Sequence, residues 1–140
     1  MRTGGDEGSI TLFFCVATAG LLALVGLVVD GGAKVRALQN ADRLAAEAGR
    51  AGGQSINVGA AITGSTPVVD ASRAVRAAQA YLAAAGVSGT VHVVDGGRQL
   101  MVDVTTSSPT VFLGIIGIDT FVVHGSATVT LVRGITGAGQ

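Results

Sequence analysis

The chain has 140 residues with nine basic and nine acidic side chains, so its formal net charge is zero and gives no electrostatic footprint for nucleic acid. Hydrophobic residues make up 49% of the chain and charged residues only 13%, which is about half the charged share of an average soluble domain. Because Cys15 is the only cysteine, an intrachain disulfide is excluded.

The first predicted element is a membrane-spanning helix from Ile10 to Val29, a run of twenty residues without a charge. At about 1.5 Å per residue this run is about 30 Å long, the thickness of a bilayer core. Twelve of its residues are Leu, Ile, Phe or Val, which favour insertion by about 4 to 7 kcal/mol in total. A cleaved secretory signal is the main rival, but such signals have shorter apolar cores and a small-residue cleavage site.

The orientation of this helix is not decided by its flanking charges. Arg2 precedes the segment, whereas Lys34, Arg36, Arg43 and Arg50 follow it, and the cation count alone places the C-terminal side in the cytoplasm. The strand-forming, lysine-poor remainder of the chain reads instead as extracytoplasmic.

Residues 30–52 are predicted to form an amphipathic helical stalk, with Gly31 and Gly32 as a soft point after the membrane and Gly52 and Gly53 as the end. One face of this stalk is narrow and rich in alanine, which suits close packing on another helix. The residues of this helix-packing stripe are Val35, Leu38, Ala41, Ala45 and Ala48.

Residues 53–140 are predicted to form a small α+β domain. A connecting loop runs from Gln54 to Pro67 and contains one short strand around residues 56–58. A second helix then begins near Asp70, which is a good N-cap, and stops at Gly86.

After Gly89 the pattern changes from helical to alternating, which predicts three strands. The first two are separated by Asp95-Gly96-Gly97, a hairpin-turn sequence. The third covers residues 121–132, and Gly125 within it suggests a bulge or bend. The expected class is therefore α+β: a long N-terminal transmembrane helix, a stalk, and one helix packed on a three-stranded antiparallel sheet.

Between the second and third strands lies the most apolar segment outside the predicted span, residues 111–118. We expect a short helix or turn folded against the sheet. If the segment is exposed instead, it marks a contact with membrane or partner, and its candidate contact residues are Phe112, Leu113, Ile115 and Ile116.

No motif for chemistry is found. His92 and His124 each stand singly in a predicted strand, and a metal site combining them with Asp103 has no ligand spacing to support it. Phosphate-binding loops, nucleophile elbows and paired catalytic carboxylates are also missing. We therefore predict neither catalysis nor a cofactor.

Three pieces of the N-terminal half, within residues 8–52, form a linked set. Gly8 to Phe13 precede and open the apolar run, Leu27 to Gly32 close it with an acid and two glycines, and Leu38 to Asp42 give a Leu-Gln-x-Ala-Asp sequence. This set resembles the TadE/TadG-like proteins of Flp (tight adherence) pilus assembly. Residues 81–89 and 112–134 also look like the extracytoplasmic part of such proteins.

The resemblance implies a pilus-assembly protein or minor pilin-like subunit of a Flp/Tad-type secretion system. It would be anchored once in the bacterial cytoplasmic membrane, with residues 1–9 as a cytoplasmic leader and the C-terminal domain outside. Its implied partners are the lipid bilayer, other pilin-like or Tad secretion subunits in an oligomer or hetero-assembly, and a prepilin peptidase. The alternative function is a membrane-tethered extracytoplasmic binding module unrelated to pili.

The peptidase of pilin-like members cuts after a glycine, which places the candidate cleavage between Gly8 and Ser9. The fifth residue of the cleaved chain would be Phe13, where the pilin-like pattern has a glutamate, so a fibre subunit and a fixed assembly factor both remain open. Mass spectrometry of the membrane form separates them, since a chain that starts at Ser9 indicates processing and an intact amino terminus indicates a fixed anchor.

Overall fold

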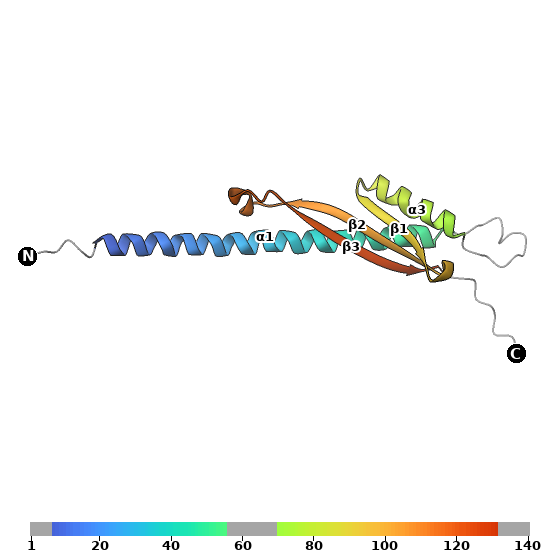
Figure 1. Ribbon diagram of the computed structural model, residues 1–140, viewed down its shortest axis with the longest axis horizontal. Coiled ribbons are helices and arrows are strands. Elements are labelled where there is room, and N and C mark those ends of the chain that lie inside the picture. The colour runs from blue at the N-terminus through green and yellow to red at the C-terminus, as the bar shows by residue number, and fades with distance from the viewer. Residues whose placement is uncertain (1–6, 56–69, 132–140) are drawn as a thin grey trace, which may run out of the picture. The chain divides into compact units, whose positions relative to one another are not determined.

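A computed structural model describes residues 7–55 and 70–131 of the chain (Figure 1). The helices are α1 (Glu7–Gly53) and α3 (Ala71–Ala84), and the strands are β1 (Ser88–Val94), β2 (Gln99–Pro109) and β3 (Thr120–Thr130). Two short 3-10 helices, η1 (Asp95–Gly97) and η2 (Leu113–Ile116), lie between the strands. The strands form one antiparallel sheet in the order β1-β2-β3, which confirms the predicted α+β class.

The chain divides into two compact units, and each unit combines two segments that are separated in the sequence. The first unit contains Met1–Val35 and Ser108–Phe121, and the second contains Arg36–Ser107 and Val122–Gln140. The boundaries assigned from the sequence to leader, span, stalk and domain stay a prediction. The predicted strand at residues 56–58 lies outside the described residues.

Helix α1 runs without a break through the predicted span and the predicted stalk. Both prolines of the chain lie elsewhere, at positions 67 and 109, so no residue inside α1 lacks a backbone donor. Gly31 and Gly32 remain helical, and the helix ends at Gly53, as the Gly52-Gly53 pair predicts.

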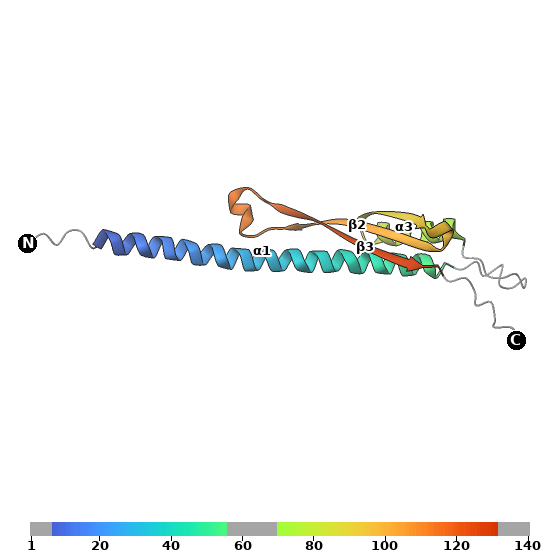
Figure 2. The same ribbon diagram turned by 60° about the horizontal axis from the view of Figure 1, so that its bottom comes forward.

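The core of the second unit lies between one face of the sheet and two helices, α3 and the C-terminal part of α1. Figures 1 and 2 show the strands side by side, with α3 next to β1. Helix α1 therefore contributes to the domain core, whereas the sequence predicted only one helix on the sheet. The buried apolar residues are Ala41, Ala45, Ala48, Ala74, Ala78, Leu82, Val91, Leu100, Val102, Val104, Val123 and Leu131.

The β1–β2 hairpin forms where the sequence predicts it. Val91 pairs with Val102, and both point to the core, while the neighbouring pair of His92 and Met101 points away from it. The turn needs positive φ angles at Asp95 (51°), Gly96 (61°) and Gly97 (91°). Glycine adopts this region at no steric cost, which explains the Gly-Gly pair.

Strand β3 passes so close to α1 that only glycine fits at position 125. A Cβ atom there would overlap the backbone of Ala41 and Asp42. Burial alternates without interruption through Gly125, so the bulge suggested by the sequence is wrong, and the glycine serves a close helix–strand approach. Next to it, the Asp42 carboxylate accepts a hydrogen bond from the N–H of Ser126 at 3.1 Å, which occupies an edge donor of the sheet.

Helix α3 begins at the predicted N-cap. The carboxylate of Asp70 accepts hydrogen bonds from the Ser72 hydroxyl at 2.6 Å and from the Ser72 N–H at 2.9 Å, with a longer one from the Arg73 N–H at 3.4 Å. The helix is followed by Gly86, whose φ of 68° fits the predicted stop.

The first prediction concerns Gly125. Gly125→Val adds a side chain where the α1 backbone lies, and overpacking of this kind should destabilise the second unit by about 3 kcal/mol. Thermal unfolding of the full chain in detergent micelles, followed by circular dichroism, measures the loss. Ser126→Val is the matched control, because its side chain is exposed on the other face of the same strand. Equal melting of the two variants would contradict the close approach.

The second prediction concerns pH. The hydrogen bonds from Ser72, with smaller contributions from Arg73 and Arg76, hold the pKa of Asp70 below its ordinary value of 3.8. A carboxyl group with a lowered folded-state pKa stabilises the fold above the unfolded-state value and loses that effect as pH falls through the folded-state value. The stability difference between the native chain and Asp70→Ala should thus be full at pH 7, begin to fall as the pH nears 3.8, and disappear only below the lowered folded-state pKa of Asp70. A difference that persists in strong acid would contradict it.

Candidate functional site

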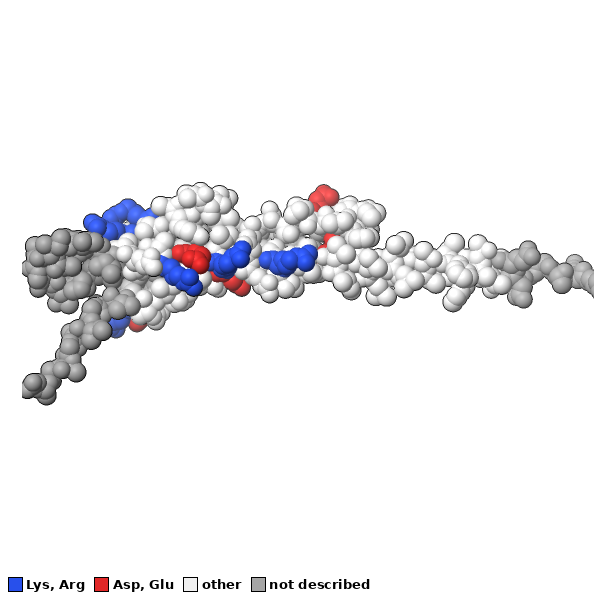
Figure 3. Space-filling view, turned by 180° about the vertical axis from the view of Figure 1, so that it is seen from behind, with Lys and Arg blue, Asp and Glu red and all other residues white. Residues whose placement is uncertain are grey.

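The apolar part of α1 is exposed along its length. Large hydrophobic side chains from Ile10 to Val29 lie open, and this is the one helix in the described part of the chain that is long and apolar enough to cross a membrane. Figure 3 shows no charged side chain on the visible face of this part of α1, whereas basic and acidic side chains gather over the later part. An exposed apolar surface of this size fits a membrane anchor.

The two residues of the candidate cleavage site, Gly8 and Ser9, lie in the first turn of α1 and are exposed. Cleavage between them stays a prediction.

The helix-packing stripe is divided between two environments. Ala41, Ala45 and Ala48 have no exposed surface, because they pack in the core of the second unit. This part of the stripe therefore packs on the chain's own sheet and on α3, so the helix that it meets belongs to the same chain. Val35 and Leu38 remain exposed.

The centre of the first unit is a carboxylate. Asp30, directly after the predicted span, is only 1% exposed. Its Oδ1 accepts the N–H of Val111 at 2.8 Å, its Oδ2 accepts the N–H of Leu113 at 2.7 Å, and the N–H of Phe112 reaches Oδ2 at 3.0 Å and Oδ1 at 3.3 Å. Three consecutive backbone donors thus surround one acceptor-only group, which is the strong, charge-assisted form of hydrogen bond.

We call residues 111–118 the apolar loop. Its middle forms η2, so the predicted short helix is confirmed, but its predicted position against the sheet is wrong. The ring of Phe112 lies on α1, where a Cβ at Gly26 would stand 2.8 Å from the Phe112 Cβ. None of the loop residues belongs to the core beneath the sheet.

Of the candidate contact residues in this loop, two are half-buried and two are exposed. Phe112 and Leu113 are the half-buried pair. Ile115 and Ile116 are 81% and 71% exposed, which is unusual for isoleucine in a packed unit. Together with Leu22, Ala23, Gly26 and Leu27 of α1, these four loop residues line an apolar hollow. The loop and the helix therefore form one continuous apolar surface.

Lys34 adds a charged side chain to the same unit. Its ammonium group lies 5.1 Å from the centre of the Phe121 ring, within the range of a cation–π contact.

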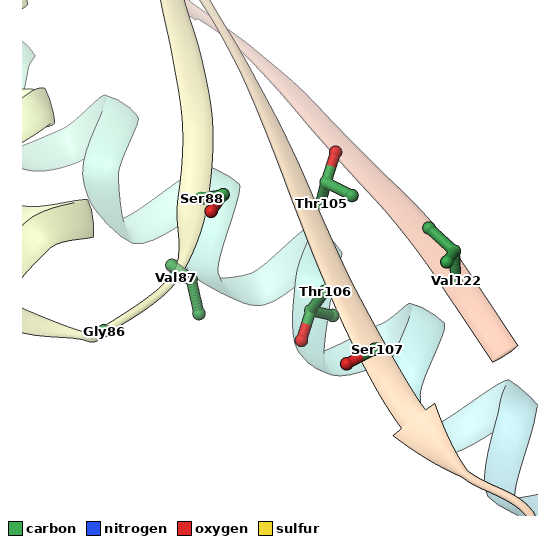
Figure 4. A pocket seen from close by; sticks show the side chains of 7 residues that line it. All are labelled: Gly86, Val87, Ser88, Thr105, Thr106, Ser107 and Val122. Atoms are coloured by element: carbon green, nitrogen blue, oxygen red, sulfur yellow. The ribbon is translucent and has the colours of Figure 1, made fainter. Parts of the chain in front are cut away.

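The second unit has a shallow hollow lined by hydroxyl groups and by no ionisable side chain. Figure 4 shows Ser88, Thr105, Thr106, Ser107 and Val122 around it, with Gly86 and Val87 beside them. Such a lining offers neither a general acid nor a general base.

The histidines lie on the outer face of the sheet and do not come together with Asp103. His124 Nδ1 is 3.1 Å from the hydroxyl oxygen of Thr105, and His92 pairs in register with Met101. In residues 7–55 and 70–131, no three His, Cys, Asp or Glu side chains gather as a metal site.

The sequence did not predict the role of Asp30. In the sequence, Asp30 is only the acid that follows the apolar run in the segment resembling the family. The signal that could have found it is its place: an acid directly at the end of an uncharged run is costly near lipid unless it is paired. The donors that pair it, however, lie 81 to 83 positions away and carry no side-chain signature.

Comparison with known protein families gives a match to the N-terminal part of the chain. Residues 8–55 match the family model described as "Putative Flp pilus-assembly TadE/G-like". No curated protein and no solved structure matched the chain. The match begins in the first turn of α1 and ends two residues after its last, so it covers this helix and leaves the sheet and α3 outside. The resemblance seen in the sequence is thereby confirmed for the segment that carries it, since residues 8–55 are similar to the TadE/G-like family.

Proposed function

We propose that this chain is a membrane-anchored pilus-assembly protein or minor pilin-like subunit of a Flp/Tad-type secretion system, which acts by helix packing and subunit association. The observation that carries the proposal is the coincidence of the family match with α1, whose exposed apolar residues need lipid or other helices around them. Association with other Tad or pilus subunits follows from the family.

The exposed apolar part of α1 is the surface that we assign to helix packing. The alanines of the later part are used inside the chain, so they are not free for a second helix. In a membrane, helices associate by close van der Waals packing and by hydrogen bonds, since lipid and leucine are equally apolar. The proposed subunit contacts therefore lie within the bilayer, at residues 10–29.

The proposed localisation is the bacterial cytoplasmic membrane, crossed once, with the amino terminus inside and the sheet outside. The absence of any charge from Ile10 to Val29 supports a single crossing. The four cations from Lys34 to Arg50 argue for the opposite orientation, but Asp42, Glu47 and the buried Asp30 accompany them.

A deletion tests the assigned function. Loss of this chain should abolish or strongly reduce Flp-type pili, measured by electron microscopy and by the amount of major pilin at the cell surface. Complementation with the native gene should restore them, and complementation with Val16→Arg should not, because an arginine near the centre of the span costs about 2.5 to 3.5 kcal/mol of insertion free energy. Val35→Arg, an exposed position beyond the span, is the matched control and should restore pili. Normal pili together with the loss of one binding activity would favour the tethered binding module instead.

A reporter fusion tests the topology. Alkaline phosphatase fused after Gln140 should be active and a green fluorescent protein fusion at the same place dark, because the phosphatase matures only outside the cytoplasm. The reversed pair of results would overturn the proposed orientation while leaving the anchor intact.

A further inference from the structure

The apolar loop is unusual because its exposed side chains contain no polar group at all. Residues 111–118 read Val-Phe-Leu-Gly-Ile-Ile-Gly-Ile, and Val111, Ile115 and Ile116 are all more than three-fifths exposed. A patch of this kind on a folded unit marks contact with lipid or with another protein. The position of the loop decides between the two.

The loop lies beside the end of the predicted span rather than away from it. Phe112 sits over Gly26, and the hollow beneath the loop extends along α1 as far as Leu22. Leu22 is about two turns of helix before Asp30, on the order of 12 Å at about 1.5 Å per residue. When residues 10–29 occupy a bilayer, the loop therefore lies at the depth of the outermost turns of the span, where interfacial elements insert.

The backbone of the loop also suits an apolar environment. A peptide in lipid must have its N–H groups paired, since no water is available. The N–H groups of Val111, Phe112 and Leu113 are held by the Asp30 carboxylate. Further along, hydrogen bonds within the loop run from Ile115 to the Phe112 carbonyl, from Gly117 to that of Gly114 and from Ile118 to that of Leu113.

The residues that flank the loop are polar or charged. Thr110 donates its hydroxyl to the Ile118 carbonyl and its N–H to the Asp119 carbonyl, which closes the loop at its base. Asp119 follows the loop directly in sequence, and Lys34 of α1 lies at the ring of Phe121. Charged groups at the base and aliphatic groups at the tip are the arrangement of a membrane-dipping segment.

We infer that residues 111–118 form a second membrane contact, a loop that inserts Val111, Ile115 and Ile116 into the outer part of the bilayer beside the transmembrane helix and that is held there by Asp30. The occupant is lipid acyl chain, not a protein partner. The inference rests on the proposed membrane anchor and adds a second point of attachment, so that the chain is fixed in depth and in rotation about α1.

Single tryptophans test this directly, because the chain contains none. The full-length protein is reconstituted in phosphatidylcholine vesicles with lipids brominated near the headgroup or near the chain end, and acrylamide reports exposure to water. Ile115→Trp and Ile116→Trp report the loop, Val16→Trp reports the middle of the span, and Val122→Trp, 60% exposed in the second unit, is the aqueous control.

The expected result is quenching of Ile115→Trp and Ile116→Trp by shallow bromines, with acrylamide quenching at least threefold weaker than for Val122→Trp. Val16→Trp should be quenched best by deep bromines. If both loop tryptophans are open to acrylamide while Val16→Trp is quenched by lipid, the loop inference is overturned and the anchor stands. If Val16→Trp is not quenched by lipid, the anchor itself fails. Loop tryptophans shielded from both quenchers would mean burial against a second copy and would also overturn the lipid assignment.

The holding role of Asp30 is tested in the Ile115→Trp background. Asp30→Asn replaces one acceptor oxygen by a donor and should raise acrylamide quenching at residue 115 at least twofold. Asp42→Asn, the same change on the same helix, contacts Ser126 instead and should leave residue 115 unaffected. Acrylamide quenching at residue 115 that stays the same in Asp30→Asn would overturn the assigned role of the carboxylate.

Discussion

The first unit depends on one interaction, the capture of three backbone N–H groups by the carboxylate of Asp30. A buried charge is costly unless it is hydrogen-bonded, and buried N–H groups without an acceptor are costly in the same way. The Asp30 carboxylate and the N–H groups of residues 111–113 satisfy each other, because the carboxylate accepts all three and the N–H groups otherwise face an apolar helix. Removal of either partner leaves the other buried without a hydrogen bond, so the contact is more sensitive to mutation than its small size suggests.

The second unit contains a similar contact between a carboxylate of α1 and the backbone, with one hydrogen bond from a single N–H group. Asp42 of α1 accepts the N–H of Ser126, and Gly125 lets the strand approach the backbone at Ala41. In each unit an acid of α1 therefore holds the backbone of a segment more than eighty residues later. Both acids belong to the α1 sequence that carries the family resemblance, and their contacts give a structural reason for an acid at each place.

Much of the local structure could be predicted because its causes are local. The 3.6-residue spacing of apolar side chains predicted α3, and the capping side chain of Asp70 predicted where it begins. The Asp-Gly-Gly sequence predicted the hairpin between β1 and β2. The site could be predicted only in part. The apolar loop, residues 111–118, was identified by its composition, but it was predicted to pack on the sheet and packs on α1 instead, because a run of apolar residues does not say which surface it covers. The role of Gly125 was predicted wrongly for the same reason, since both a bulge and a close approach to a distant helix place a glycine within a strand sequence.

In the proposed function, the burial of the alanines inside the chain changes where subunits can meet. A stripe of Ala41, Ala45 and Ala48 looks suited to a second helix, yet close packing on the chain's own strands needs the same small side chains. Once these residues are used internally, what α1 offers to other subunits is its earlier part, from Ile10 to Val29, with its exposed leucines and valines. That surface is apolar on every side, so it gains little from the hydrophobic effect when it moves from lipid to a like helix. The proposed subunit recognition therefore depends on shape, and an element that fixes the depth and rotation of α1 in the bilayer would supply the orientation that such shape-dependent packing requires.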